Sequence, residues 1–173
     1  MQRLAMALAL LVVGSAGCAD PYVRIYHMLE TSPRPAVRVV GQPPVLDGGD
    51  APRALPPGYS ELAAIVARTI ARDWPNDAVE VGAALPPPAV TAEVWVRGHW
   101  SQQDRQLLVN VDLLVRKAPG GDWVGRPWIL ASLTEGGDLD AALPTLLERL
   151  RTQVAAGTAT WVKDVKAAGT AAR

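Results

Sequence analysis

Two runs of alternating apolar and polar side chains, Ala92 to Ser101 and Leu107 to Val115, constrain the fold more than any other feature of this chain. In the first run, one face carries Val94, Val96, Gly98 and Trp100. The second run alternates in the same way. Successive side chains of a β-strand point to opposite faces, so this period of two predicts half-buried antiparallel strands. The short connection around Asp104 predicts that the two strands form a hairpin.

Further strands are predicted on both sides of this hairpin. A third run, Trp123 to Leu133, contains Pro127, and a proline inside a strand favours an edge position or a bulge because it lacks an amide donor. Two shorter apolar runs, Ala36 to Val40 and Ala78 to Ala84, are also consistent with strands. The sequence therefore predicts a mainly antiparallel sheet of three to five strands.

A helix is predicted over Tyr59 to Asp73, where Leu62, Val66 and Ile70 follow the spacing of one buried stripe. It should end at Trp74, because the residue before a proline avoids helical angles. The apolar stripe of such a helix must cover another apolar surface, and the amphipathic strands supply one. The order of strand, helix, antiparallel strands and helix predicts a two-layer α+β sandwich with two helices packed on one face.

The second helix of this order begins near Asp138 or Asp140 and carries a leucine-rich stripe that reaches Val154. Pro144 either lies in the first turns of this helix or divides it. Residues 156–173 are rich in alanine, threonine and glycine. This C-terminal tail either continues as helical turns docked on the domain or frays, and the sequence leaves both possibilities open.

Seven prolines are concentrated between residues 33 and 57. Proline fixes its own backbone angle and cannot donate a hydrogen bond, so this stretch resists helix and central strand. It is interpreted as a tether, which reaches about 3.1 Å per extended residue, or as a surface loop. We expect a proline-rich tether over 18–35, followed by an α+β domain over 36–155 that contains a long loop over 42–58.

The N-terminus has the three parts of an export signal, namely Arg3, an apolar run from Leu4 to Val13, and small residues from Gly14 to Gly17. The apolar run is well short of the roughly 20 residues that span a bilayer. Residues 1–17 are therefore predicted to be a signal peptide. Its removal from the 173 residues leaves 156, which is one domain of ordinary size.

Cys18, the only cysteine, follows this leader directly. The segment from Ser15 to Cys18 resembles the lipobox of bacterial lipoproteins, in which the thiol takes a diacylglycerol and the cysteine becomes the first residue. Ser15 stands where leucine is usual. The alternative is ordinary cleavage after Ala16, which would leave a free thiol in an oxidising compartment. By resemblance to known sorting rules, Ala19 after the cysteine favours the outer membrane, with the domain facing the periplasm.

Composition and motifs argue against several classes of function. Loss of Arg3 turns a balance of 17 basic and 17 acidic residues into a formal charge of about minus one, so a nucleic-acid partner is not expected. His27 and His99 lack ligand neighbours at metal-binding spacing. The sequence has neither a nucleophile elbow nor a phosphate-binding loop. We therefore expect no metal, no cofactor and no enzymatic activity.

The stretch from Thr91 to Leu150 resembles a group of small bacterial envelope domains. The group includes the curli secretion lipoprotein, the FlgO-type flagellar lipoprotein, the LpoB-type activator of penicillin-binding proteins and the N-terminal domain of TolB. In these domains a strand ending in glycine, here Val94 to Gly98, leads through a polar hairpin to a second strand, a third strand and a final amphipathic helix. The resemblance implies a binding or assembly module of secretion, flagellar or cell-wall machinery.

The chain has six tryptophans and no phenylalanine. Trp95 shares a strand face with Arg97 and His99, while Trp123 and Trp128 lie on opposite faces of the third run, so that at least one of them faces outward. A tryptophan beside an arginine on an exposed sheet is typical of a protein-binding hot spot.

The candidate site is therefore a partner-binding surface formed by Trp95, Arg97, His99 and Trp128. It would belong to a non-enzymatic outer-membrane lipoprotein that binds an envelope protein. Two alternatives stay open. In the first, the outer sheet face is covered by the C-terminal tail or the proline segment, and its tryptophans are ordinary packing. In the second, the domain is a periplasmic lipid or glycan carrier with a pocket lined by tryptophan and leucine.

Overall fold

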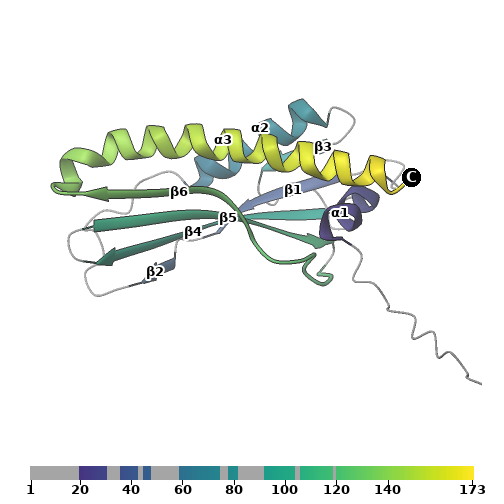
Figure 1. Ribbon diagram of the computed structural model, residues 1–173, viewed down its shortest axis with the longest axis horizontal. Helices are drawn as coiled ribbons and strands as arrows, with labels where there is room; N and C mark the ends of the chain where they lie inside the picture. The colour runs from purple at the N-terminus through teal and green to yellow at the C-terminus, as the bar shows by residue number, and fades with distance from the viewer. Residues whose placement is uncertain are drawn as a thin grey trace, which may run out of the picture.

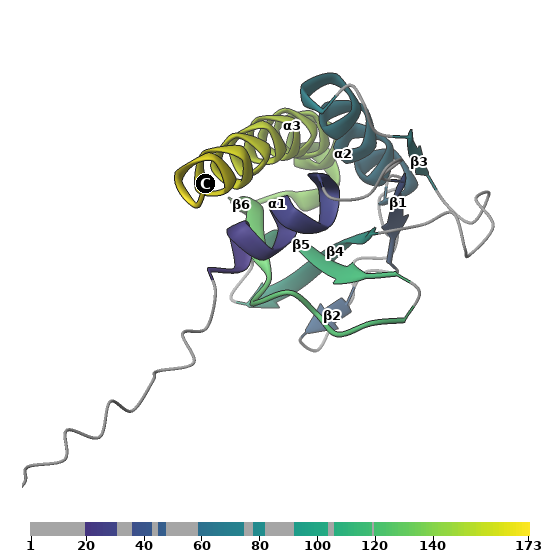
Figure 2. The same ribbon diagram turned by 90° about the vertical axis from the view of Figure 1, so that its right-hand side faces the viewer.

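The chain forms a two-layer α+β domain, in which a six-stranded sheet carries helices on one face (Figures 1 and 2). The computed structural model describes residues 20–30, 36–42, 45–47, 59–74, 78–81, 92–103, 106–118 and 120–173. The helices are α1 (Pro21–Glu30), α2 (Tyr59–Asp73) and α3 (Leu139–Ala171). The strands are β1 (Ala36–Gly41), β2 (Val45–Asp47), β3 (Ala78–Val81), β4 (Ala92–Gln103), β5 (Gln106–Lys117) and β6 (Trp128–Gly136).

The strands follow the order β3-β1-β4-β5-β6, and β2 lies beside β4. Strand β1 runs parallel to β3 and β4, whereas β4, β5 and β6 are antiparallel neighbours. Helix α2 connects the β1 side of the sheet to β3, which is the usual way for a chain to return to a parallel strand. The predicted α+β class is thus confirmed, and the sheet has one strand more than the largest number expected. The additional short strand, β2, falls within the predicted loop over 42–58.

The predicted hairpin is the longest ladder of the sheet. Strands β4 and β5 pair in continuous register from Ala92 opposite Lys117 to Gln103 opposite Gln106. Six side chains that the alternation assigned to the core are buried: Val94, Val96, Val109, Val111, Leu113 and Val115. The side chains of Trp100 and Leu107, assigned to the same face, lie outside the described set. The six buried side chains lie beneath the helices, so the opposite set of side chains points to the other face of the sheet.

Strand β6 begins later than the sequence predicts. It starts at Trp128, after Pro127, while Trp123 forms only an isolated bridge to Arg116. Gly125, with φ of 84°, turns the chain between these two tryptophans, a conformation that favours glycine. The strand lies at the sheet edge, and its register with β5 shifts between Val111 and Asp112. A proline inside the run predicts an edge position or a bulge. The edge position is confirmed, while Pro127 itself precedes the strand and the register shift falls between Ile129 and Ala131.

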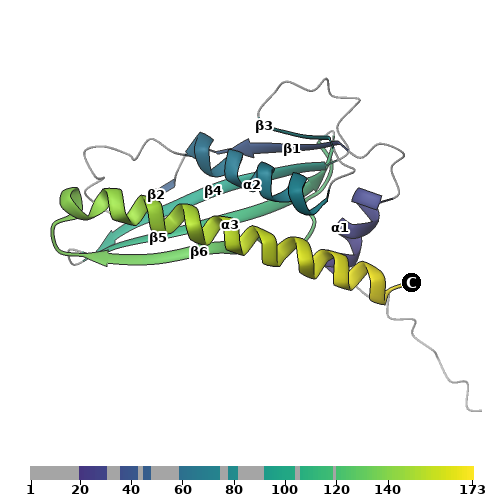
Figure 3. The same cartoon turned by 90° about the horizontal axis from the view of Figure 1, so that it is seen from above.

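Helix α2 has the predicted bounds, and α3 is longer than predicted. Asp138 caps α3, since the amide of Ala141 donates to its Oδ1 at 3.3 Å. Pro144 lies inside the helix without dividing it. The predicted tail over 156–173 continues the same helix to Ala171, because its inward face carries buried side chains. At 1.5 Å per residue, α3 is about 50 Å long and extends along the whole sheet (Figure 3).

The predicted tether over 18–35 is wrong for residues 20–30. Pro21–Glu30 forms α1, and Ile25, Tyr26 and Leu29 on one side of this helix are buried in the main core. Proline suits the first turn of a helix, because the amide it lacks would have had no partner there. Residues 20–30 are therefore part of the folded domain and do not form an extended linker.

Two glycines allow α3 to approach its neighbours closely. A Cβ atom at Gly157 would lie 2.3 Å from the carbonyl oxygen of Leu130 in β6. A Cβ atom at Gly169 would overlap the ring of Tyr26 in α1. Helix α3 thus packs on the edge strand and on α1 through positions without side chains. No helix among the described residues is long and apolar enough to cross a membrane.

Candidate functional site

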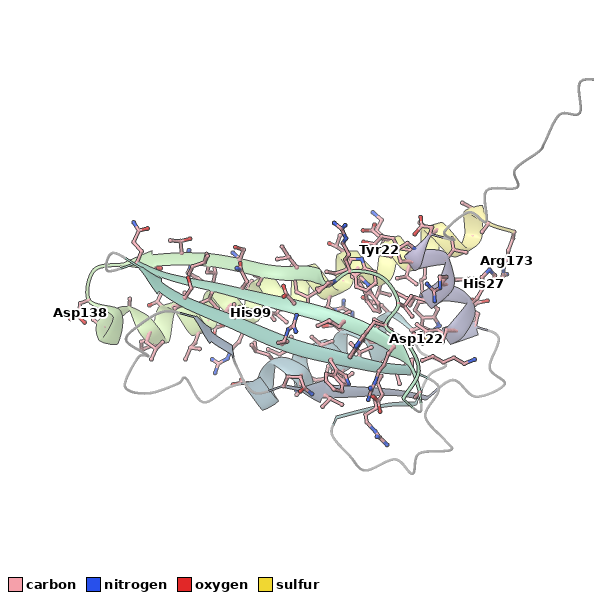
Figure 4. All side chains as sticks on the ribbon, turned by 90° about the horizontal axis from the view of Figure 1, so that it is seen from below. Tyr22, His27, His99, Asp122, Asp138 and Arg173 are labelled. Carbon is pink, nitrogen blue, oxygen red and sulfur yellow. The ribbon has the colours of Figure 1, made fainter. Side chains whose placement is uncertain are left out.

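Among the described residues, one face of the sheet has no helix over it, as seen from below in Figure 4. Helices α2 and α3 lie over the other face, and the outward side chains of β4 and β5 form what we call the open face. Trp95, Arg97 and His99 of β4 all belong to it, opposite Leu114, Asp112 and Asn110 of β5. The three residues predicted from the β4 pattern therefore lie in one row on the same surface.

Glu93 is the centre of an ionic network at one end of this row. The residue is only 8% exposed, and its carboxylate accepts hydrogen bonds from Arg116 Nε at 2.6 Å and from Trp95 Nε1 at 3.3 Å. Arg38 of β1 pairs with the same carboxylate at 3.5 Å. A carboxylate buried to this degree requires paired charges and hydrogen bonds, and both are present.

Two tryptophans and Arg116 form an aromatic group above this carboxylate. The rings of Trp95 and Trp123 meet edge to face, with centroids 5.0 Å apart and planes at 81°. The guanidinium of Arg116 lies 4.7 Å from the centroid of Trp95 and 5.3 Å from that of Trp123. Both distances are within the range of cation–π attraction. We call Glu93, Arg38, Arg116, Trp95 and Trp123 the tryptophan–arginine cluster.

A second, smaller ionic group follows along β4. Asp112 of β5 lies 3.9 Å from Arg97 and 3.4 Å from Nε2 of His99, measured from its Oδ2. The side chain of Asp112 is 14% exposed, and those of Arg97 and His99 are 34% and 28% exposed. Nε of Arg97 is buried without a hydrogen-bond partner among the described residues.

The large exposed hydrophobic side chains of the described residues also lie on the open face, spread along its length. They are Leu108, Trp123 and Ile129, with exposures of 36%, 40% and 68%. Leu108 pairs with Ser101 of β4, Ile129 pairs with Asp112, and Trp123 forms a bridge to Arg116. The open face therefore combines apolar side chains with fixed arginines and carboxylates.

Trp128 does not join the other predicted residues. It pairs with Leu113, whose side chain is in the core, and its ring lies 5.5 Å from Tyr22 of α1 and 6.2 Å from Trp161 of α3. Trp123 instead faces outward, in agreement with the prediction that these two tryptophans lie on opposite faces. Cys18, the predicted lipidation site, lies outside the described residues.

The described residues contain no group of three or more histidine, cysteine or acidic side chains that could hold a metal ion. A groove of about 410 Å³ lies between α2 and α3. Its lining consists of three arginines, two threonines, an isoleucine and an alanine: Arg68, Arg72, Arg151, Thr69, Thr152, Ile65 and Ala155. This lining differs from the tryptophans and leucines expected of a lipid or glycan carrier.

Comparison with known proteins adds little to this geometry. No protein-family model and no curated protein matches the chain. Among solved structures, an uncharacterized protein is similar at 13% identity with a TM-score of 0.37, over 81% of this chain and 92% of the other. A putative neuraminyllactose-binding hemagglutinin homolog from Helicobacter pylori is similar at 10% identity with a TM-score of 0.42, over 78% and 82%.

Proposed function

We propose that this chain is a non-enzymatic lipoprotein of the bacterial outer membrane that faces the periplasm and binds an envelope protein through the open face. The leader and Cys18 support the membrane attachment, as set out from the sequence. The partner would belong to the secretion, flagellar or cell-wall machinery implied by the resemblance to small envelope domains. Its binding surface is centred on Trp95, Arg97 and His99.

The observation that carries the proposal is that all three large exposed hydrophobic side chains of the described residues lie on this one face, spaced along β5 and β6 beside paired arginines and carboxylates. Tryptophan and arginine are also the residue types that contribute most to binding hot spots. Here Trp95 is held by Trp123 and Arg116, so a partner would meet a pre-formed surface and lose little side-chain entropy on binding.

A matched pair of arginine variants tests the binding surface. Arg97→Ala removes a charge from the open face, whereas Arg149→Ala removes one from α3, where Arg149 pairs with Glu135. A photo-crosslinker placed at Ile129, the most exposed of the large hydrophobic residues, would report the partner in intact cells. We expect Trp95→Ala and Arg97→Ala to abolish the crosslinked product and Arg149→Ala to preserve it. Equal products from all three variants would exclude the open face as the binding site.

Metabolic labelling with a palmitate analogue tests the attachment. The parent chain should take up the label, and Cys18→Ser should not. Absence of label from the parent chain would end the lipoprotein proposal, while leaving the surface test above unaffected.

A further inference from the structure

We propose that the end of the domain formed by α1 and residues 120–128 rests on the lipid surface, with Trp123 and Arg126 at the level of the lipid headgroups. This inference rests on the proposed acylation of Cys18. It adds an orientation: one particular end of the molecule faces the bilayer, and the strands lead away from it.

The first argument is the short distance between the acylation site and the folded domain. The amide of Tyr22 donates to Oδ1 of Asp20 at 2.8 Å, and the amide of Arg24 donates to the Asp20 carbonyl at 3.1 Å. Asp20 is therefore fixed as the cap of α1, and only Ala19 separates it from Cys18. Two Cα–Cα steps reach about 8 Å at most. An acyl chain on Cys18 would hold the beginning of α1 at the membrane surface.

The second argument is the segment that packs beside this beginning. A Cβ atom at Gly125 would lie 2.9 Å from Cβ of Pro21, so the chain at Gly125 lies directly against the first residue of α1. The contact between Tyr22 and Trp128 holds the other end of the same segment. Figure 4 shows Tyr22, His27 and Arg173 at this end of the molecule and Asp138 at the opposite end.

The third argument is the chemistry of the surface at this end. Trp123 is 40% exposed, and Tyr22 and Trp128 are half-buried. Tryptophan and tyrosine concentrate at membrane–water interfaces, because each has an apolar ring and a polar group. Arg24 and Arg126 are exposed beside these rings, but the exposed Asp20 and Asp122 offset their charge. The aromatic side chains, more than net charge, would therefore make the contact with lipid.

The orientation has a consequence for the open face. Strand β4 begins at this end and its twelve residues extend about 40 Å at the usual rise per residue. The hairpin between Gln103 and Gln106 would then lie at the end of the molecule away from the bilayer (Figure 1). Arg97 and His99 would lie between the bilayer and this hairpin, accessible to a periplasmic protein.

Fluorescence quenching in vesicles tests this orientation with the full mature lipoprotein. Acylation consumes the thiol of Cys18, so a single introduced cysteine can be labelled selectively. We would compare Arg126→Cys with Gln106→Cys, two exposed positions, in vesicles of phosphatidylethanolamine and phosphatidylglycerol that contain a headgroup quencher. Quenching at position 126 should exceed that at position 106 several-fold. Equal quenching, or stronger quenching at position 106, would overturn the orientation.

Two further measurements separate the possible causes of failure. The mass of the purified chain and its flotation with vesicles report acylation. An unlipidated chain would refute the proposed attachment. A lipidated chain with equal quenching at both positions would refute the orientation alone. Trp123→Ala in the labelled Arg126→Cys chain should lower quenching about two-fold or more, whereas Ile129→Ala should leave it unchanged. Equal effects of these two substitutions would exclude Trp123 from the lipid contact.

Discussion

Substitution of Gly157 by alanine should destabilise the domain, although alanine is the better helix former. Alanine is favoured over glycine inside a helix by about 1 kcal/mol. Against this gain, the new methyl group would lie 2.3 Å from the Leu130 carbonyl oxygen and 2.9 Å from its carbonyl carbon and Cα. All three are backbone atoms of a paired strand, so no side-chain rotation can relieve the contact.

The size of the loss follows from these opposing effects. Overpacking of a well-filled core costs about 1–3 kcal/mol, and contacts with backbone alone belong to the upper part of this range. After the gain in helix propensity, we expect a net loss of about 1–2 kcal/mol in the free energy of unfolding. For a domain of roughly this size, each kcal/mol lowers Tm by about 2–4 °C. Urea denaturation of the mature chain, followed by tryptophan fluorescence and circular dichroism, measures the change.

Thr160→Ala is the control for this substitution, since it changes helix propensity at an exposed position three residues away on α3. Its stability should equal or slightly exceed that of the parent chain. If Gly157→Ala raised stability by about 1 kcal/mol, as propensity alone requires, then α3 would not approach β6 this closely and the reasoning would be refuted.

Three more predictions concern the tryptophan–arginine cluster and the contact between α1 and α3. Glu93→Ala leaves two arginines without their carboxylate and should cost about 2–3 kcal/mol, less than the about 3–5 kcal/mol typical of a fully buried pair. Urea denaturation would measure this loss of stability, and Glu93→Gln should lose less stability than Glu93→Ala. Burial raises the pKa of Tyr26, so the folded state binds this proton more tightly. The contribution of Tyr26 to stability should be constant below about pH 10, the unperturbed value, and should be lost as the pH rises through the raised pKa. Tyr26→Phe should lessen this alkaline loss, and an unchanged pH profile would contradict the assignment. Gly169→Ala should displace the Tyr26 ring and speed amide hydrogen exchange in α1 while the sheet stays protected; uniform exchange would show that α1 does not open separately.

The sequence predicts the elements that have a clear local pattern. The bounds of α2 and the register of the β4–β5 hairpin follow from periodicity, because each buries one face along its whole length. Helix α1 was missed since it has only ten residues, and short helices depend on tertiary packing for their stability. Its stripe of Ile25, Tyr26 and Leu29 is visible in the sequence, but the α3 surface that it covers lies more than a hundred residues later.

The open face was predicted only in part, because strand alternation is visible in the sequence whereas contacts between strands are not. Alternation places Trp95, Arg97 and His99 on one side of a strand, and this needs no knowledge of neighbouring strands. The contacts of Glu93 with Arg116, and of Trp95 with Trp123, depend on the cross-strand register and on the turn at Gly125. The pattern could show that Trp123 and Trp128 face opposite ways. It could not show which of them the helices would cover.

The packing of α1 on α3 also determines when folding can be completed. Helix α1 is synthesised first, but Tyr26 cannot complete its packing until Gly169 has followed it. Contacts between such distant parts of a chain form slowly, since a long loop must close before they contribute stability. The sheet can therefore assemble before the domain is sealed, and a protease that acts during folding would meet an α1 segment that has not yet docked on α3.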